Sequence, residues 1–349
     1  MNRKNRLQDI AGLAGVGIAT VDRVLNERGN VSAGTAERVL QAARRLKLKR
    51  ILPASHQRLL RIEILLARPE LPLIARMNHE FSRQSERIDR SVVIQRTVIN
   101  NETPRVIASH IEATKCNAVI VYAQDHPFIH AAIESARKRS VPVVTMISDL
   151  PQSARLAYAG TDHYAAGRTA GFFMAGMMRE PGAIVVLCNH FGFQSHEERV
   201  RGFRDALAVY APLLTIAEII EGGDDSLKSE RLLLKTFRSR RAIAGFYNVG
   251  AANDAASVAL RSGVLAQKPI FIGHELTHET RPMLRDGIMT LVIDQNPEHQ
   301  ARFAVDVLLH HFGYTEQTWL AAPYRSNVAF RLFSPENIAE FTTPRSKSD

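Results

Sequence analysis

The chain has 349 residues, 45% of them hydrophobic, so it is long enough to form two or three globular domains with buried cores. No run approaches the 18 apolar residues of a membrane span, and no apolar signal-peptide stretch follows the basic N-terminus, so we expect a cytoplasmic protein. The net charge of +10 is concentrated in residues 1–61, which hold 13 Lys and Arg against 4 Asp and Glu. This asymmetry favours a polyanionic partner such as DNA. Cys116 and Cys188 belong to no CxxC pair, so we expect neither a disulfide framework nor a thiolate zinc site.

The basic segment carries the apolar periodicity of three short helices. Glycines at 15 and 17 interrupt the pattern between the first two helices, and Ser32 is a suitable N-cap for the third. The periodic stretches are Leu7–Ala14, Val21–Leu25 and Ala33–Leu46. The sequence therefore predicts an all-α helix-turn-helix headpiece over residues 1–52.

After a connector at residues 53–61, apolar strand-like runs alternate with amphipathic helices. The expected strands are 62–67, 92–98, 118–122, 141–147, 183–188, 214–220, 243–247, 269–272 and 289–293. Such alternation predicts an α/β effector domain over residues 62–349, with two doubly wound parallel-sheet lobes and a ligand cleft between them. We expect the first lobe at about 62–161 plus 296–326 and the second at about 162–295 plus 327–340.

The segment Leu7–Asn26 (LQDIAGLAGVGIATVDRVLN) and the following Val31–Thr35 strongly resemble the DNA-binding headpiece of the LacI family of transcription regulators. The resemblance implies that the second helix enters the major groove of a near-palindromic operator bound by a homodimer, or by a tetramer of two dimers. It places Ile18, Ala19 and Arg23 against base edges, where the Arg23 guanidinium can form a bidentate contact to guanine. The phosphate contacts that it implies come from Thr20, Asn26, Ser32 and Thr35. Asp22 departs from the family pattern and adds a negative charge close to DNA.

The connector resembles the family's hinge helix at Pro53, Arg58 and Leu60 but departs from it at Ala54 and Gln57. The resemblance implies that Leu60 inserts into the minor groove as an apolar wedge. A leucine packed on the core of the following domain is the open alternative.

From Ile62 to about Phe333 the chain resembles the family's effector domain, which shares its fold with periplasmic sugar-binding proteins. The segments that carry this resemblance are Gly160–Arg168, Glu198–Phe203, Tyr247–Asn248, Gly273–Thr277 and Asp294–Pro297. It implies ligand contacts from Asp149, Asp162, Arg199, Asn248, Glu275 and Gln295. Carboxylates, an arginine and amides suit a sugar or polyol, although each residue could equally cap a strand end or helix start. The segment Leu71–Ile74 lacks the aromatic that often stacks on a sugar, and a purine or another small metabolite is an alternative effector.

His274–His278 satisfies HExxH, the signature of zinc metalloproteases. That chemistry needs both histidines on one helix face. Here the motif follows an expected strand, and Thr277 is a good N-cap for the next helix, so we expect a strand-to-helix loop instead. The chain contains no GxSxG, no P-loop and no GxGxxG after a strand. We therefore expect no enzyme, no cofactor and no metal site.

Overall fold

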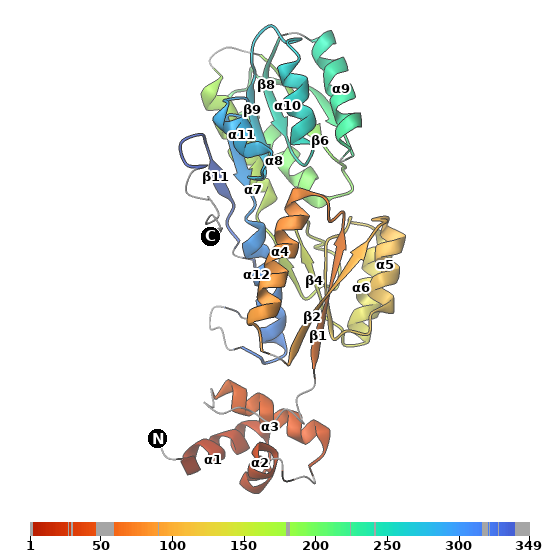
Figure 1. Cartoon of the computed structure of the whole chain (residues 1–349), viewed down its shortest axis with the longest axis vertical. Helices are drawn as coiled ribbons and strands as arrows, with labels where there is room; N and C mark the ends of the chain where they lie inside the picture. The colour runs from red at the N-terminus through yellow and green to blue at the C-terminus, as the bar shows by residue number, and fades with distance from the viewer. Residues whose placement is uncertain are drawn as a thin grey trace, which may run out of the picture.

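A computed structural model describes residues 3–26, 28, 31–46, 59–89, 91–178, 182–223, 225–240, 242–315, 320, 322–326 and 328–338. Figure 1 shows three helices in the N-terminal headpiece, followed by two α/β lobes stacked end to end along the long axis. The predicted fold class is thereby confirmed.

The headpiece consists of α1 (Arg3–Ala14), α2 (Ile18–Leu25) and α3 (Ala33–Arg45). Its core is formed by apolar side chains that repeat at helical spacing, among them Ile10, Val21, Val24, Val39 and Leu40. Gly15, with φ of 63°, makes the tight turn between α1 and α2, a conformation that glycine adopts without a Cβ penalty. The helix-turn-helix predicted from the sequence is present.

The first lobe contains a five-stranded sheet in which all strands pair in parallel, in the order β2-β1-β3-β4-β5. The strands are β1 (Leu60–Ala67), β2 (Val92–Ile99), β3 (Ala118–Val121), β4 (Val143–Met146) and β5 (Ala157–Ala159). Helices α4 (Pro72–Arg87) and α12 (Pro297–His311) pack on one face through Phe81 and Phe303. Helices α5 (Pro104–Ala113) and α6 (Pro127–Lys138) cover the other face. Because β1, β3 and β4 are covered on both faces, their sequences are nearly continuous apolar runs.

The second lobe contains a six-stranded sheet in the order β11-β10-β9-β8-β6-β7, in which β11 pairs antiparallel with β10. The strands are β6 (Ala183–Cys188), β7 (Thr215–Glu221), β8 (Ile243–Asn248), β9 (Ile270–His274), β10 (Leu291–Asp294) and β11 (Arg331–Phe333). Helices α7 (His163–Met177) and α8 (Gln194–Tyr210) pack on one face of this sheet. The other face is covered by α9 (Ser226–Ser239), α10 (Asn253–Arg261) and α11 (Thr280–Arg285). None of the described helices is long and apolar enough to cross a membrane.

The wedge assignment of Leu60 is contradicted by its position as the first residue of β1. Its side chain is 4% exposed and belongs to the core of the first lobe, and its N–H donates to the Ser91 carbonyl at 2.8 Å. A leucine anchored in this way packs on the lobe, which was the alternative interpretation. Pro53, Ala54, Gln57 and Arg58, which carried the hinge-helix resemblance, lie outside the described residues.

Helices α7 and α8 approach each other closely because two glycines lie at their crossing. A Cβ on Gly167 would lie 2.1 Å from the Arg199 carbonyl oxygen, and one on Gly202 would lie 2.2 Å from the Tyr164 carbonyl oxygen. Such distances are shorter than any Cβ contact, so only glycine permits this crossing. The close crossing sets the position of the α8 backbone at Arg199.

Replacing Gly167 by Ala is expected to force α7 and α8 apart and to lower the free energy of unfolding by about 1–3 kcal/mol, the usual effect of overpacking. Gly176→Ala, near the exposed end of the same helix, is the matched control because nothing lies within 4 Å of its Cβ position. The control should be neutral or stabilise by up to about 1 kcal/mol through helix propensity. Urea unfolding of both variants tests this, and equal effects would contradict the close-crossing explanation.

Candidate functional site

A cavity of about 290 Å³ lies between the two lobes at the carboxyl ends of their strands. In each sheet the strand order reverses at one point, between β1 and β3 in the first lobe and between β6 and β8 in the second. Open α/β sheets bind ligands at such switch points. Arg68 and Tyr122 follow β1 and β3, while Asn189 and Gly250 lie just beyond β6 and β8, and all four line the cavity. The cavity therefore occupies the place where this fold forms ligand sites.

Arg199, in the second turn of α8, supplies a positive charge to the cavity. Its side chain is buried, Nε donates to His163 Nδ1 at 3.2 Å, and Nη1 donates to the Val249 carbonyl at 2.7 Å. Both partners are neutral acceptors. Within the described residues no carboxylate accepts a hydrogen bond from Arg199, so its guanidinium keeps donor capacity for a ligand.

Glu275 follows β9 in the left-handed conformation, with φ of 70°, and lines the cavity. Oε1 accepts a hydrogen bond from Gln295 Nε2 at 2.6 Å, whereas the buried Oε2 accepts none from the described residues. Burial, together with the nearby Asp294 carboxylate, raises the pKa of Glu275 to about 7, although the Arg76 and Arg199 charges act in the opposite direction. The carboxyl group is therefore held in place on one side and open to a hydrogen bond on the other.

Three buried histidines surround Arg199. Burial, with the Arg199 charge added, lowers the pKa of His163 and His274 well below the usual value and that of His196 to about 3. All three are therefore neutral near pH 7 and act as hydrogen-bonding groups rather than charges. His274 Nε2, for example, is 2.9 Å from the Tyr247 hydroxyl.

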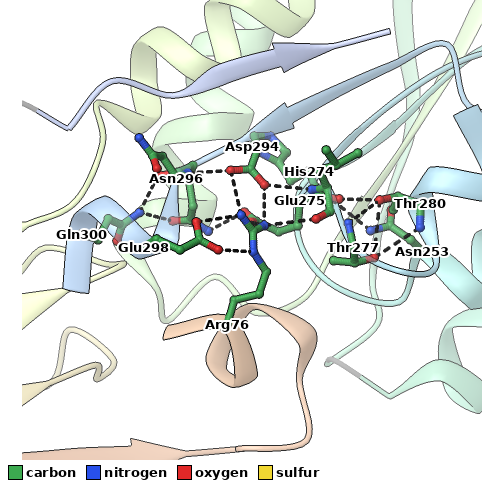
Figure 2. Close-up of polar contacts among 12 residues, drawn as sticks. Arg76, Asn253, His274, Glu275, Thr277, Thr280, Asp294, Asn296, Glu298 and Gln300 are labelled. Carbon is green, nitrogen blue, oxygen red and sulfur yellow. Dashed lines mark hydrogen bonds and ion pairs between the residues drawn. The ribbon is translucent and has the colours of Figure 1, made fainter. Parts of the chain in front are cut away.

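Arg76, on α4 of the first lobe, reaches across to the second lobe (Figure 2). Its Nη1 donates to Asp294 Oδ2 at 2.5 Å and to the Leu276 carbonyl at 3.2 Å, while Nε and Nη2 donate to the Glu298 carboxylate at 2.8 and 2.9 Å. Burial lowers the pKa of Arg76, but the Asp294 and Glu298 carboxylates outweigh it and raise the pKa above the usual arginine value. The closest approach of Arg76 Nη1 to Glu275 Oε2 is 3.6 Å. Arg76 therefore braces the two lobes beside the cavity.

Of the six ligand contacts predicted from the sequence, the structure brings Arg199, Glu275 and Gln295 together at the cavity. Asn248 does not line the cavity, and its Nδ2 instead donates to Asn253 Oδ1 at 2.8 Å, which holds the cavity-lining Asn253 in place.

The structure does not bring the other two predicted contacts to the cavity, and both act here as local structural groups. Asp149 accepts hydrogen bonds from Arg155 Nη2 at 2.6 Å and from the Leu150 N–H at 2.7 Å. Asp162 caps the N-terminus of α7 by accepting from the Ala165 N–H at 2.8 Å. Neither side chain lines the cavity.

Among the cavity residues that the sequence-based prediction missed are Asn189, Ser195 and Tyr122. Asn189 Oδ1 and Ser195 Oγ are buried in the cavity wall without a hydrogen-bond partner among the described residues. Tyr122 lines the cavity and stacks on Phe193 with ring centroids 4.7 Å apart, which supplies an aromatic surface that the first strand end lacks. The only available signal was that Tyr122 and Asn189 directly follow apolar strands.

The HExxH residues lie on a strand end and a loop, as predicted. His274 ends β9, Glu275 begins the loop, and the His278 side chain is 82% exposed beyond it. Thr277 Oγ1 accepts from the Thr280 N–H at 3.2 Å at the start of α11. Across the described part of the chain, no three His, Cys, Asp or Glu side chains gather closely enough to hold a metal ion.

In the headpiece, α2 presents Ile18, Ala19 and Arg23 to solvent, with Ile18 42% exposed. Arg28 Nη1 donates to Asp22 Oδ2 at 2.9 Å, so the negative charge of Asp22 is paired with the positive charge of Arg28. Asn26 Nδ2 also donates to Asp22 Oδ1, at 2.6 Å.

The remaining predicted phosphate contacts lie around the same surface. Thr20 and Thr35 are half-buried, and the exposed Ser32 Oγ accepts from the Thr35 N–H at 3.4 Å at the start of α3. An exposed helix face beside helix N-termini is the geometry of a major-groove reader.

A family model described as periplasmic binding protein domain matches residues 77–314, and the chain therefore belongs to this family. A second model, described as bacterial regulatory proteins of the lacI family, matches residues 6–49. Together with the fold, these matches define a helix-turn-helix transcription regulator of LacI type, with an effector domain of periplasmic binding protein fold. The prediction made from the headpiece motif is confirmed.

The chain is similar to the HTH-type transcriptional regulator GalR of Salmonella typhimurium, with 26% identity over 270 residues that cover 74% of this chain and 75% of the relative. Among solved structures it is similar to a solute binding protein from Burkholderia graminis in complex with D-arabinose, with a TM-score of 0.75, 20% identity, and coverage of 81% of this chain and 98% of the other. GanP, a glucose-galactose binding protein from Geobacillus stearothermophilus, gives a TM-score of 0.72 at 19% identity, and the match covers 80% of this chain and 98% of GanP. The two structural likenesses show the fold.

The raised pKa of Glu275 makes the stability of the effector domain pH-dependent. Folded Glu275 holds its proton more tightly than the unfolded chain does, so its contribution is complete below about pH 4.5 and is lost as the pH rises through about 7. Glu275→Gln removes this titration, so its melting temperature relative to the unmodified protein should rise between pH 4.5 and about 8. The neutral histidines titrate equally in both proteins and cancel in the difference. Thermal unfolding across this range is the measurement, with the exposed Glu112→Gln as control, and a pH-independent difference would show that Glu275 is ionised throughout.

Proposed function

We propose that a neutral polyhydroxylated molecule, a sugar or polyol, binds in the cavity between the lobes and controls the affinity of the headpiece for operator DNA. The observation that carries this proposal is a set of buried polar atoms around one cavity. Asn189 Oδ1, Ser195 Oγ and Glu275 Oε2 are buried there without hydrogen-bond partners among the described residues. Buried polar atoms are nearly always hydrogen-bonded in folded proteins, so these atoms mark positions for a ligand.

The chemistry of these atoms favours hydroxyl groups. The amide and carboxylate oxygens accept hydrogen bonds and so need donors, whereas Arg199 donates and needs an acceptor. A hydroxyl group provides both within one small group. Around the cavity the acidic groups Glu70, Asp254 and Glu279 outnumber Arg68 and Arg199 even without Glu275, which disfavours an anionic effector. The similar proteins that bind D-arabinose or glucose and galactose agree with this class of ligand.

For the headpiece we propose binding of a homodimer to a near-palindromic operator, with a tetramer of two dimers as the alternative assembly. The support is the exposed face of α2 and the basic charge of the first 61 residues. Such a protein works in the bacterial cytoplasm, by binding rather than by catalysis.

A thermal-shift screen tests the effector proposal, because a ligand that binds only the folded state raises the melting temperature. The panel is D-galactose, D-glucose, D-arabinose, galactitol, adenine and hypoxanthine. We expect at least one sugar or polyol to stabilise the unmodified protein. A shift with the purines alone would contradict the proposal and favour the purine alternative.

For the stabilising compound, Arg199→Lys should weaken binding at least tenfold in calorimetry, because lysine keeps the charge but loses the planar fork of donors. Arg201→Lys is the matched control, two residues further along α8, where the arginine is 59% exposed and paired with Glu198 at 2.5 Å. The control should bind as the unmodified protein does. Equal affinities for all three proteins would remove Arg199 from the site.

For the headpiece, Arg23→Ala should weaken binding by about 1–3 kcal/mol and relax base preference at one symmetric pair of positions. The test uses an operator selected from random duplex DNA, with the unselected pool as the nonspecific reference. Arg137→Ala, an exposed arginine on α6, is the control and should leave both affinities unchanged. A loss that is equal on selected and random DNA would make Arg23 a phosphate contact instead.

A further inference from the structure

A continuous set of hydrogen bonds connects the two cavity residues Arg199 and Glu275 through the first lobe. It begins at Arg199 Nε, which donates to His163 Nδ1, so the histidine proton resides on Nε2. From Nε2 the histidine donates to the Ile147 carbonyl at 2.5 Å. The contact passes from the second lobe to the first, because His163 begins α7 whereas Ile147 follows β4.

The connection continues from the N–H group of Ile147. The Ile147 N–H donates to Gln300 Oε1 at 3.2 Å, and Gln300 Nε2 donates to the carbonyl and the side-chain oxygen of Gln295 at 2.9 and 3.1 Å. Gln295 Nε2 then donates to Glu275 Oε1, which returns to the cavity in the second lobe. Gln300 and Glu275 are both visible in Figure 2. We call the set Arg199, His163, Ile147, Gln300, Gln295 and Glu275 the Ile147 hydrogen-bond chain, and each of its members is at most 8% exposed.

Ile147 itself has an unusual backbone. Its φ of 65° lies in the left-handed region, which a β-branched side chain rarely adopts. Such a conformation persists only where the surroundings hold it, and it concentrates at functional sites. Arg68, Ala252 and Glu275 share this conformation and also line the cavity. The Ile147 carbonyl accepts from His163 Nε2 and also from the Tyr158 hydroxyl, at 3.0 Å. The Ile147 N–H donates to Gln300 Oε1 and, at 3.4 Å, to the Ala159 carbonyl. Of these four contacts, those with His163 and Gln300 connect Ile147 to the two cavity residues.

We propose that His163 and Gln300 are positioning residues of the effector site, which hold Ile147 in its left-handed conformation and thereby fix Arg199 and Glu275 relative to each other. The proposal depends on the proposed function in one respect, which is that the cavity is the effector site. Since the chain is buried, a group that loses its partner has no water to replace it, so displacement at one end is transmitted to the other. A ligand that draws Glu275 toward it would in this way move Gln295, Gln300 and the first-lobe backbone at Ile147.

Hydrogen exchange of the ligand-free, full-length protein tests the continuity of the chain. Gln300→Met keeps the side-chain volume but removes the hydrogen bonds to Ile147 and Gln295. We expect at least tenfold faster exchange at the Ile147 amide and several-fold faster exchange at the Glu275 amide, which donates to Ile293 O. Gln84→Met is the matched control, because Gln84 is a glutamine of α4 whose buried Nε2 has no partner among the described residues. Unchanged exchange at Glu275 in Gln300→Met would overturn the proposal.

A second pair of variants tests the chain from its other end. His163→Leu should lose the contacts to Arg199 and Ile147, and His163→Gln, which can both accept and donate, should restore part of the slow exchange at Ile147. With D-galactose or D-arabinose as probe, His163→Leu should also raise Kd at least fivefold, with partial rescue by His163→Gln. Equal Kd values for both variants would reduce His163 to a packing residue. If none of the four sugars and polyols of the thermal-shift panel binds the unmodified protein, the sugar proposal fails, while the exchange comparison still decides whether the chain exists.

Discussion

The geometry of the cavity depends on the ion pairs of Arg76, which joins α4 of the first lobe to Asp294 of the second and to Glu298 of α12. A partly buried guanidinium is stable only with well-placed carboxylates, and Asp294 and Glu298 supply them from the two ends of the connection between β10 and α12. Asp294 also accepts from the N–H groups of Leu276 and Asn296, at 3.0 and 2.8 Å. One charge cluster therefore fixes the loop after β9 and the loop after β10 together. Glu275 lies on the first of these loops and Gln295 on the second, so the Arg76 cluster also sets the distance between these two residues.

Much of the fold could be predicted because burial leaves a direct signature in the sequence. A strand covered on both faces is apolar along nearly its whole length, and the run from Ala118 to Val121 shows this pattern. The short strands β5 and β11, three residues each, escaped prediction because three residues carry no periodicity. The turn at Gly15 was recognisable because a positive φ between two helices requires a residue without Cβ.

The candidate site was predictable only in part, because a polar residue after a strand looks the same whether it faces a cavity or a backbone N–H. Asp162 and Glu275 both follow strands, yet the first is satisfied by the N–H three residues later and the second points into the cavity. Arg76 gave no signal, since its partners are more than 200 residues away in the sequence. Leu60 was misassigned because an apolar residue at a domain boundary can pack on either side of it.

The first lobe is built from two segments that are far apart in the chain, and this has a consequence for protein synthesis. Strands β1 to β5 leave the ribosome early, but α12, which covers one face of their sheet through Phe303 and Leu308, follows only after the strands of the second lobe up to β10. Helix α4 is made early, but α12 is the helix that packs against β4 and β5, so until then the nascent chain exposes Val144, Met146 and Ala157 or covers them with non-native contacts. Transiently exposed apolar surface of this kind promotes aggregation. The first lobe should therefore be a poor candidate for expression as a contiguous fragment ending after β5, and a circular permutant that begins at α12 should relieve the delay.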